Sequence, residues 1–141
     1  DKAAMRNIMS DRSSRAPLSA VKAVCTADKL IEMQKKAKAV FVDDAIYDYI
    51  SDLCDATRHN ENISLGVSPR GALALCRIAK AWACYNGREY VVPQDVRDFF
   101  IHVCSHRIAL SPKGRLAGLA AESVLEEIMK EVKCPENEEK R

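Results

Sequence analysis

The spacing of apolar residues along the chain predicts a series of amphipathic helices. The first is expected within residues 1–10, ahead of a break at Ser13–Pro17, and Thr26 can cap a second. Asp43 or Asp44 caps a third, which should end around residues 58–60. The apolar positions of this third helix recur at intervals of three and four, so we expect one buried face made of Ile46, Tyr49, Ile50, Leu53, Cys54 and Thr57.

The fourth predicted helix, residues 69–86, is apolar on nearly all sides. Its few charged side chains fall on one narrow stripe: Arg70, Arg77 and Lys80. A helix with so little polar surface is expected at the centre of a bundle, where its neighbours cover it. Trp82 and Tyr85 are then expected to anchor the core.

Two further helices and two short extended segments complete the pattern. Gly87 ends the fourth helix, and Pro93 begins a fifth. The fifth should bury Val96, Phe99, Phe100, Val103 and Cys104, and the sixth should bury Val124, Leu125, Ile128, Met129 and Val132. Residues 40–42 and 90–92 are extended and could pair. The predicted fold class is all-α, a bundle of about five to six helices with short extended connections.

Composition agrees with one compact, mostly helical domain. The chain has 141 residues, of which 48% are hydrophobic and 6% aromatic. Its net charge is +2, with basic and acidic residues interleaved, which differs from the concentrated basic face of a nucleic-acid-binding protein. No apolar run approaches the roughly 20 residues that cross a bilayer, and no signal-peptide pattern opens the chain. Because it begins at Asp1 without a methionine, we expect a fragment of a longer protein.

The reactive side chains indicate no catalytic or metal site. The six cysteines form no Cys-x-x-Cys pair, so we interpret them as small buried side chains in a reducing cytosol. His102 and His106 have the spacing of metal ligands on a helix, but no third ligand is evident. The carboxylate pairs at 43–44 and 126–127 fit a helix cap and a solvated face.

The segment Ser68-Pro69-Arg70 stands where the fourth helix is expected to begin. Ser68 is a good N-cap, and Pro69 suits the first helical position. Arg70 follows in the first turn, where the helix dipole favours a carboxylate over a guanidinium. Its placement makes more sense if an anion binds there, since helix N-termini and arginines both bind phosphate. On spacing alone, plain capping with a surface arginine is the alternative.

Six segments follow one another along the chain: Val40–Asp44, Tyr49-Ile50, Ala56–Arg58, Leu65–Arg70, Gly87–Val96 and His106–Ile108. In this order they resemble the C-terminal lid domain of the MoxR family of AAA+ ATPases. The resemblance runs from near residue 1 to about Pro135. It implies a connection from an absent ATPase core at 1–15 and a helical lid at 16–134. Residues 135–141 are expected to form a disordered tail.

The resemblance implies a specific role for Arg70. In that family the arginine of the Ser-Pro-Arg motif is the sensor-2 residue, which reaches from the lid to the phosphates of ATP in the core. A guanidinium aimed at the γ-phosphate would distinguish ATP from ADP, and Ser68 and Pro69 could border the nucleotide. The segments Ala56–Arg58 and Gly87–Val96 would be scaffold for the fourth helix, although Arg58 could instead contact the core or a neighbouring subunit.

The chain lacks the nucleotide-binding motifs that the core of such an ATPase would carry. Neither a Gly-x-x-x-x-Gly-Lys-Ser/Thr phosphate loop nor a Walker B strand occurs, so ATP and Mg²⁺ would be held mainly by the core. This chain alone is therefore expected to be inactive. The parent would be a cytoplasmic ATPase that forms a homo-oligomeric ring and acts as a chaperone in the maturation of protein complexes. Its partners would be its own AAA+ core and von Willebrand A-domain proteins, with no nucleic acid and no membrane.

Two other functions are open on sequence grounds. One is a helical domain that binds DNA or RNA through Arg77, Lys80, Arg107, Lys113 and Arg115. The near-neutral charge balance argues against it. The other is a stand-alone protein-interaction bundle with no link to a nucleotide. A phosphate loop encoded about one core domain upstream of Asp1 would favour the ATPase.

Overall fold

The computed structural model describes residues 1–14 and 21–135, with the backbone alone for residues 11–14. Its internal contacts divide the chain into two units, Asp1–Met33 and Gln34–Arg141. The described residues form seven α-helices and one small two-stranded sheet, which confirms the all-α fold class. The expected boundary between a connection and a lid stays a prediction, and the expected tail lies outside the described residues except for Pro135.

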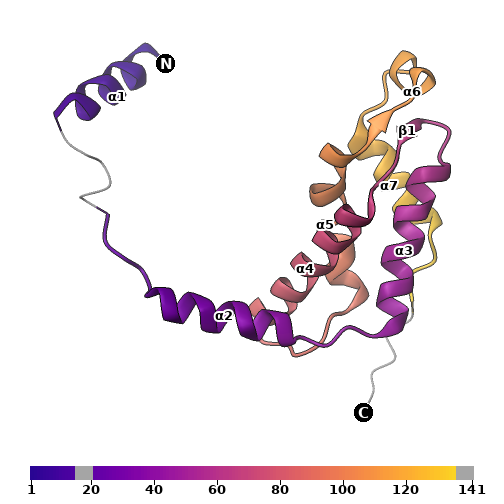
Figure 1. The fold of residues 1–141 in the computed structure, drawn as a ribbon. Helices are drawn as coiled ribbons and strands as arrows, with labels where there is room; N and C mark the ends of the chain where they lie inside the picture. Colours follow the sequence, from indigo (N-terminus) through magenta and orange to yellow (C-terminus); the bar gives the residue numbers. More distant parts are fainter. Residues whose placement is uncertain (15–20, 136–141) are drawn as a thin grey trace. The chain divides into compact units, whose positions relative to one another are not determined.

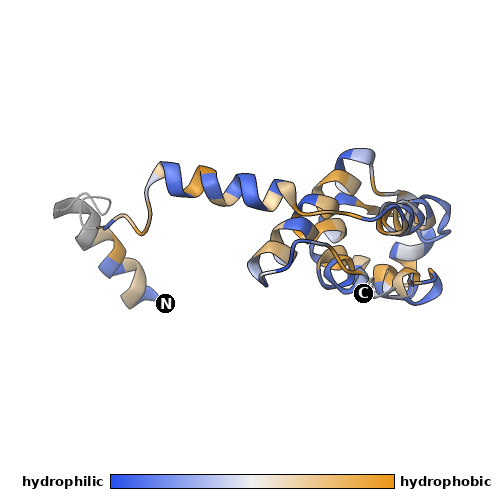
Figure 2. Cartoon of the chain, turned by 90° about the horizontal axis from the view of Figure 1, so that it is seen from below, coloured by the Kyte–Doolittle hydropathy of each residue, from blue (hydrophilic) through white to orange (hydrophobic). Residues whose placement is uncertain are grey.

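The first unit contains α1 (Lys2–Ser14) and the beginning of α2 (Ala27–Ala39). Thr26 caps α2 as predicted, because its hydroxyl accepts a hydrogen bond from the Lys29 amide at 3.2 Å. Hydrophilic and hydrophobic residues both occur along α2 (Figure 2), and none of its side chains is buried. The apolar side chains of α1 are also exposed: Met5, Ile8 and Met9. The described side chains of the first unit therefore form no core of their own.

The second unit is a bundle of α3 (Asp44–His59), α4 (Pro69–Tyr85), α5 (Pro93–Cys104) and α7 (Ala121–Glu131). The helix α4 lies mainly against α5, while α3 contacts α4, α5 and α7 (Figure 1). One core joins the four helices, and each contributes a side chain with no exposed surface: Leu53, Leu75, Phe100 and Leu125. The burial of large apolar side chains from every helix stabilises the bundle as one unit.

The buried face of α3 is the one predicted. All six of its expected core residues are buried, from Ile46 to Thr57. Asp43 is the N-cap, and its carboxylate accepts a hydrogen bond from the Ala45 amide at 3.0 Å. The helix ends at His59, within the predicted range. The spacing of large apolar side chains was sufficient here because they fall on one side of the helix only.

The position predicted for α4 at the centre of the bundle is wrong. Its buried residues are four small or medium ones on a single face: Gly71, Leu75, Ala79 and Ala83. Leu73 is 57% exposed and Tyr85 is 80% exposed. Trp82 stacks on Tyr85 and meets the edge of Phe99, so this aromatic group sits at the border of the core and Tyr85 is no anchor within it. Alanine made α4 look apolar on all sides, but an exposed alanine costs little.

The predicted buried faces of α5 and α7 are confirmed in part. Val96, Phe100 and Cys104 of α5 are buried, as are Val124, Leu125 and Ile128 of α7. The flanking residues are partly exposed and pack against the core: Phe99, Val103, Met129 and Val132. None of the helices in the described residues has the length and hydropathy that a transmembrane span requires.

Two short extended pairings join the helices. Phe41 forms a parallel bridge with Tyr90, which confirms the predicted pairing of residues 40–42 with 90–92. A second pairing was missed: β1 (Ile63–Leu65) lies antiparallel to β2 (Ala109–Leu110). Between α5 and β2 the chain makes one 3₁₀ turn, η2 (Ser105–Arg107), and after β2 it forms the short helix α6 (Pro112–Leu116). β1 thus lies in the segment that leads into α4, and β2 pairs with it from beyond the end of α5.

Candidate functional site

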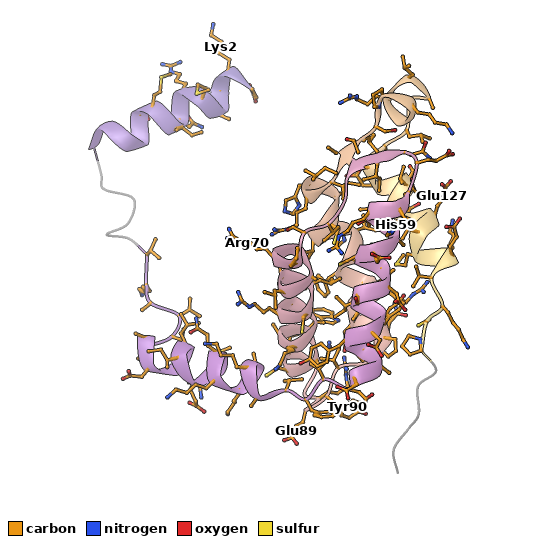
Figure 3. The ribbon with its side chains drawn as sticks, turned by 45° about the vertical axis from the view of Figure 1, so that its right-hand side comes forward. Lys2, His59, Arg70, Glu89, Tyr90 and Glu127 are labelled. Carbon is orange, nitrogen blue, oxygen red and sulfur yellow. The ribbon has the colours of Figure 1, made fainter. Side chains whose placement is uncertain are left out.

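The first turn of α4 presents Arg70 to solvent. Ser68 is the N-cap and Pro69 occupies the first helical position, as predicted. The Ser68 hydroxyl and carbonyl both accept from the Gly71 amide, at 3.4 and 2.8 Å. Arg70 is exposed and points away from the bundle, at the end of α4 opposite Tyr90 (Figure 3). Within the part of the chain that the structure describes, no carboxylate lies within ion-pair distance of its guanidinium.

The residue before the cap is anchored to the end of α3 through its backbone. The Val67 amide donates to the Thr57 hydroxyl at 2.8 Å. The Val67 carbonyl accepts two hydrogen bonds from Arg58, one from Nε at 3.1 Å and one from Nη2 at 2.9 Å. The Thr57 hydroxyl in turn donates to the Cys54 carbonyl at 2.6 Å. Both polar groups of the Val67 backbone therefore bond to consecutive residues of α3.

Close packing restricts the same loop. A Cβ added at Gly66 would lie 2.8 Å from the Arg58 backbone nitrogen, so only glycine lets the loop lie this near α3. A Cβ at Gly71 would lie 2.6 Å from Cγ1 of Val67. The Val67 side chain has no exposed surface. The start of α4 is thus packed against Val67, and Val67 is packed against α3.

The start of α6 has nearly the same sequence as the start of α4, with lysine in place of arginine. Ser111 caps α6 with its hydroxyl toward the Gly114 amide, and Pro112 is in the first helical position. Lys113 occupies the place that Arg70 has in α4, but its ammonium pairs with Glu61 at 2.6 Å. Two local sequences, Ser-Pro-Arg-Gly and Ser-Pro-Lys-Gly, therefore differ in their surroundings. The cation of α6 has a carboxylate within the chain, and that of α4 is open to an outside anion.

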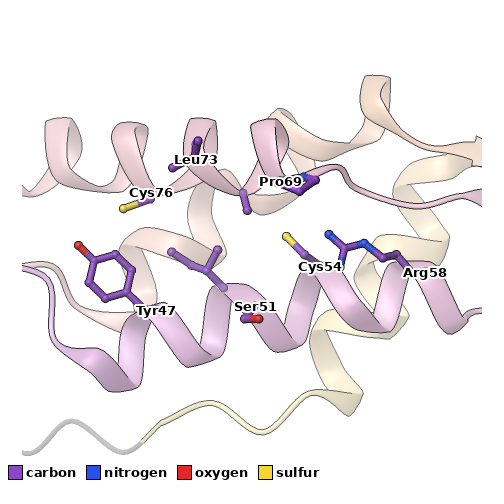
Figure 4. Close-up of a pocket in the computed structure, with 9 residues that line it drawn as sticks. Tyr47, Ser51, Cys54, Arg58, Pro69, Leu73 and Cys76 are labelled. Atoms are coloured by element: carbon purple, nitrogen blue, oxygen red, sulfur yellow. The ribbon is translucent and has the colours of Figure 1, made fainter.

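A groove of about 470 Å³ lies between α3 and the first turns of α4. Tyr47 and Ile50 line it from α3, and Leu73 and Cys76 line it from α4 (Figure 4). Pro69 and the Arg58 side chain border it at the N-terminal end of α4. The side of α4 next to Arg70 is consequently uncovered, in agreement with the exposure of Leu73.

An ion pair fixes the opposite end of α4. Arg88 donates to both carboxylate oxygens of Asp95, at 2.7 and 2.6 Å, and Asp95 also accepts from the Val92 amide at 2.9 Å. These hydrogen bonds from Arg88 raise the pKa of its guanidinium above the ordinary value. Asp95 stands in the first turn of α5, where a carboxylate interacts favourably with the helix dipole. Its 2% exposure also makes it the buried, charged anchor of the turn from α4 to α5.

The other reactive groups remain apart. Among the described residues, no three histidine, cysteine or carboxylate side chains gather in a way that could hold a metal. All six cysteines are free thiols. Burial raises the pKa of Cys54 to about 11 and that of Cys104 to about 12, so both stay protonated near neutral pH. Only Cys54 and Cys104 are buried, which corrects the expectation that all six are. Cys25 is exposed, and the other three are half-buried: Cys76, Cys84 and Cys134.

Of the five cations considered for nucleic-acid binding, some bond to other groups of the chain and others are exposed. Lys113 is engaged by Glu61, and Arg107 donates through Nε to the Val103 carbonyl at 2.9 Å. Arg77 is exposed and Lys80 is half-buried on α4, whereas Arg115 is exposed on α6. Engagement of two of the five within the chain weakens the case for one basic contact set.

The comparisons with known proteins place this fold in a family. The model of the AAA lid domain family matches residues 55–128, which include the end of α3, the Ser68–Arg70 turn and the Arg88–Asp95 pair. The YeaC protein of Bacillus subtilis is 33% identical over 92% of this chain, and Chaperone MoxR1 of Mycobacterium tuberculosis is 30% identical over 89%. The chain spans 40% and 35% of the length of these two relatives.

A solved structure has the same fold. It is a crystal structure from Cytophaga hutchinsonii, of a protein provisionally named an ATPase. It matches 96% of this chain and 44% of its own, with a TM-score of 0.78 and 26% identity. These matches confirm the resemblance drawn from the ordered segments, whereas the roles of Ser68, Pro69 and Arg70 stay predictions. The chain belongs to the AAA lid domain family, and its lid is of the MoxR type.

Proposed function

We propose that this lid belongs to an ATP-hydrolysing enzyme and that Arg70 senses the γ-phosphate of ATP bound in a separate core domain. The supporting observation is the open guanidinium in the first turn of α4, on a helix start fixed by α3. Arginine forms paired, charge-assisted hydrogen bonds with phosphate oxygens. The N-terminal amides of α4 add a favourable dipole for the same anion.

In this proposal, the chain supplies one part of a composite site. The core holds ATP and Mg²⁺, because the printed sequence contains no Gly-x-x-x-x-Gly-Lys-Ser/Thr segment. Ser68 and Pro69 border the nucleotide beside Arg70. The lid closes when Arg70 meets the γ-phosphate and opens when that phosphate has left, so hydrolysis is coupled to rigid-body motion. The chain alone is inactive.

The proposed parent is a cytoplasmic AAA+ ATPase that assembles as a ring of identical subunits. A chaperone role in the maturation of protein complexes is the proposed task, and its support is the name of the mycobacterial relative, Chaperone MoxR1. Proteins with von Willebrand A domains are the proposed partners.

The test is ATP turnover by the full-length protein with Arg70→Ala. Loss of one preorganised donor to the transferred phosphate is expected to lower turnover by about 100-fold or more. The bundle should stay folded, because Arg70 is exposed and is not part of the hydrophobic core. Far-UV circular dichroism and thermal unfolding of the variant check that its fold is intact.

Lys113→Ala is the matched control. It removes a cation from the corresponding position of the other Ser-Pro-basic-Gly turn, where the ammonium is paired with Glu61. Turnover of this variant should stay within about twofold of wild type, since surface ion pairs contribute little. If Arg70→Ala has wild-type turnover, or if Arg70→Ala and Lys113→Ala lose turnover equally, Arg70 does not bind the nucleotide.

A further inference from the structure

We infer that Arg58 and Thr57 are positioning residues, which set the direction of Arg70 through the backbone of Val67. This inference rests on the proposed function of Arg70. The Val67 amide and carbonyl bond to Thr57 and Arg58 at 2.8 to 3.1 Å, so the peptide groups on both sides of Val67 are fixed. Val67 lies three positions before Arg70, and Ser68 and Pro69 between them are committed to the cap.

The contacts of Arg58 favour a role within the lid. Its Nε and Nη2 both donate to the Val67 carbonyl, which uses two of the five N–H groups of the guanidinium. Its Nη1 lies 3.9 Å from a carboxylate oxygen of Asp55, an ion-pair distance that is too long for a hydrogen bond. These contacts hold the guanidinium against the Val67 carbonyl. Arg58 thus acts on Val67, and through it on Arg70.

The Thr57 hydroxyl completes the arrangement. It donates its one proton to the Cys54 carbonyl at 2.6 Å and accepts from the Val67 amide at 2.8 Å. Thr57 has no exposed surface, so water cannot replace either bond. Because Gly66 and Gly71 allow the closest approach on either side of Val67, movement of the loop is also restricted sterically. The end of α3 and the start of α4 should consequently move as one body.

The first experiment measures ATP turnover of the full-length protein in a double-mutant cycle. Arg58→Ala and Thr57→Val are each expected to lower kcat by about tenfold, whereas Thr57→Ser keeps the hydroxyl and should stay within about twofold. Lysine lacks the planar pair of donors, so Arg58→Lys is expected to restore activity only in part. In an Arg70→Ala background, Arg58→Ala and Thr57→Val should lower kcat by less than about twofold further, since the residue they direct is absent.

Arg97→Ala is the control for a merely structural arginine. Arg97 bonds the Met129 carbonyl and the Tyr49 hydroxyl at 3.5 Å, on α7 and α3. The Arg97→Ala substitution should lower the midpoint of thermal unfolding without a change in kcat. Equal losses of kcat by Arg58→Ala with and without Arg70 would overturn the inference. A wild-type kcat in Arg70→Ala would instead refute the proposed function of Arg70.

A second experiment needs no nucleotide and uses the 141-residue chain itself. The hydrogen-bonded amides at the start of α4 are those of Val67, Gly71 and Ala72. Their hydrogen exchange should speed up by about tenfold or more in Thr57→Val and Arg58→Ala, while Thr57→Ser stays near wild type. Amides in the middle of α7 serve as the internal reference. Unchanged exchange at Val67 and Gly71 in both variants would show that Thr57 and Arg58 do not fix the start of α4.

Discussion

The buried ion pair at the far end of α4 gives a test of the bundle that is independent of any nucleotide. Asp95 is 2% exposed and accepts three hydrogen bonds, two from Arg88 and one from the Val92 amide. Asp95→Asn keeps the size of the side chain but replaces one acceptor oxygen by a donor that faces the guanidinium. The substitution therefore removes the ion pair and one acceptor, and Arg88 keeps only the remaining amide oxygen and the Tyr90 carbonyl at 3.2 Å.

The expected cost follows from how far each partner is buried. Removal of one member of a fully buried pair costs about 3–5 kcal/mol of unfolding free energy. The Arg88 side chain is 26% exposed, so water can solvate part of the abandoned charge. We therefore expect about 2–3 kcal/mol. At about 4 °C per kcal/mol for a domain of this size, the midpoint of thermal unfolding should fall by roughly 8–12 °C.

Urea unfolding of the 141-residue chain, followed by far-UV circular dichroism at neutral pH, measures this cost. Asp98→Asn is the matched control, because Asp98 lies one turn further along α5 and is exposed, with a hydrogen bond from Gln94 at 2.6 Å. It should change stability by less than about 0.5 kcal/mol. Arg88→Ala completes a double-mutant cycle, and the coupling energy should be at least about 1 kcal/mol. If Asp95→Asn costs no more than Asp98→Asn, the pair does not fix this turn.

Two further predictions concern the core. Leu75→Ala should cost about 2–5 kcal/mol of unfolding free energy because Leu75 is fully buried, whereas Leu73→Ala on the open side should cost less than about 1 kcal/mol; equal costs in urea unfolding would contradict a one-sided α4. The pKa of Cys104 rises from 9.0 to about 12 on folding, chiefly by burial. Its contribution to stability is therefore complete below pH 9 and falls as the pH rises toward 12, because only the unfolded thiol ionises in that window. Cys104→Ala should flatten the decline of stability above pH 9 relative to wild type, and Cys25→Ala, an exposed control, should not; identical slopes in all three proteins would refute this.

The regular parts of the fold were predictable because they depend on large apolar side chains. The buried face of α3 and the caps at Thr26, Asp43 and Ser68 follow from local sequence, and each is confirmed. The prediction that α4 lies at the centre of the bundle was wrong because it counted alanines as apolar residues, and an alanine contributes little buried area to a core. The sequence therefore showed where α4 begins and ends, and not which of its sides is covered.

The candidate site was predictable only in part. Ser68, Pro69 and Arg70 could be assigned to a helix start from their order alone. The contacts of Thr57 and Arg58 could not, because Thr57 accepts from a backbone amide and Arg58 donates to a backbone carbonyl about ten positions away, and backbone groups carry no sequence signal. One hint was present: a threonine at a core position near a helix end must place its hydroxyl somewhere. The β1–β2 pair was missed for a similar reason, since its strands are very short and lie far apart in sequence.

The most direct test of the central claim compares the affinities of the full-length protein for ATP and ADP before and after Arg70→Ala. If Arg70 recognises the γ-phosphate, wild type should prefer the triphosphate, and the variant should lose at least about tenfold of that preference with ADP affinity nearly unchanged. An unchanged ratio of ATP to ADP affinity in Arg70→Ala would contradict the account.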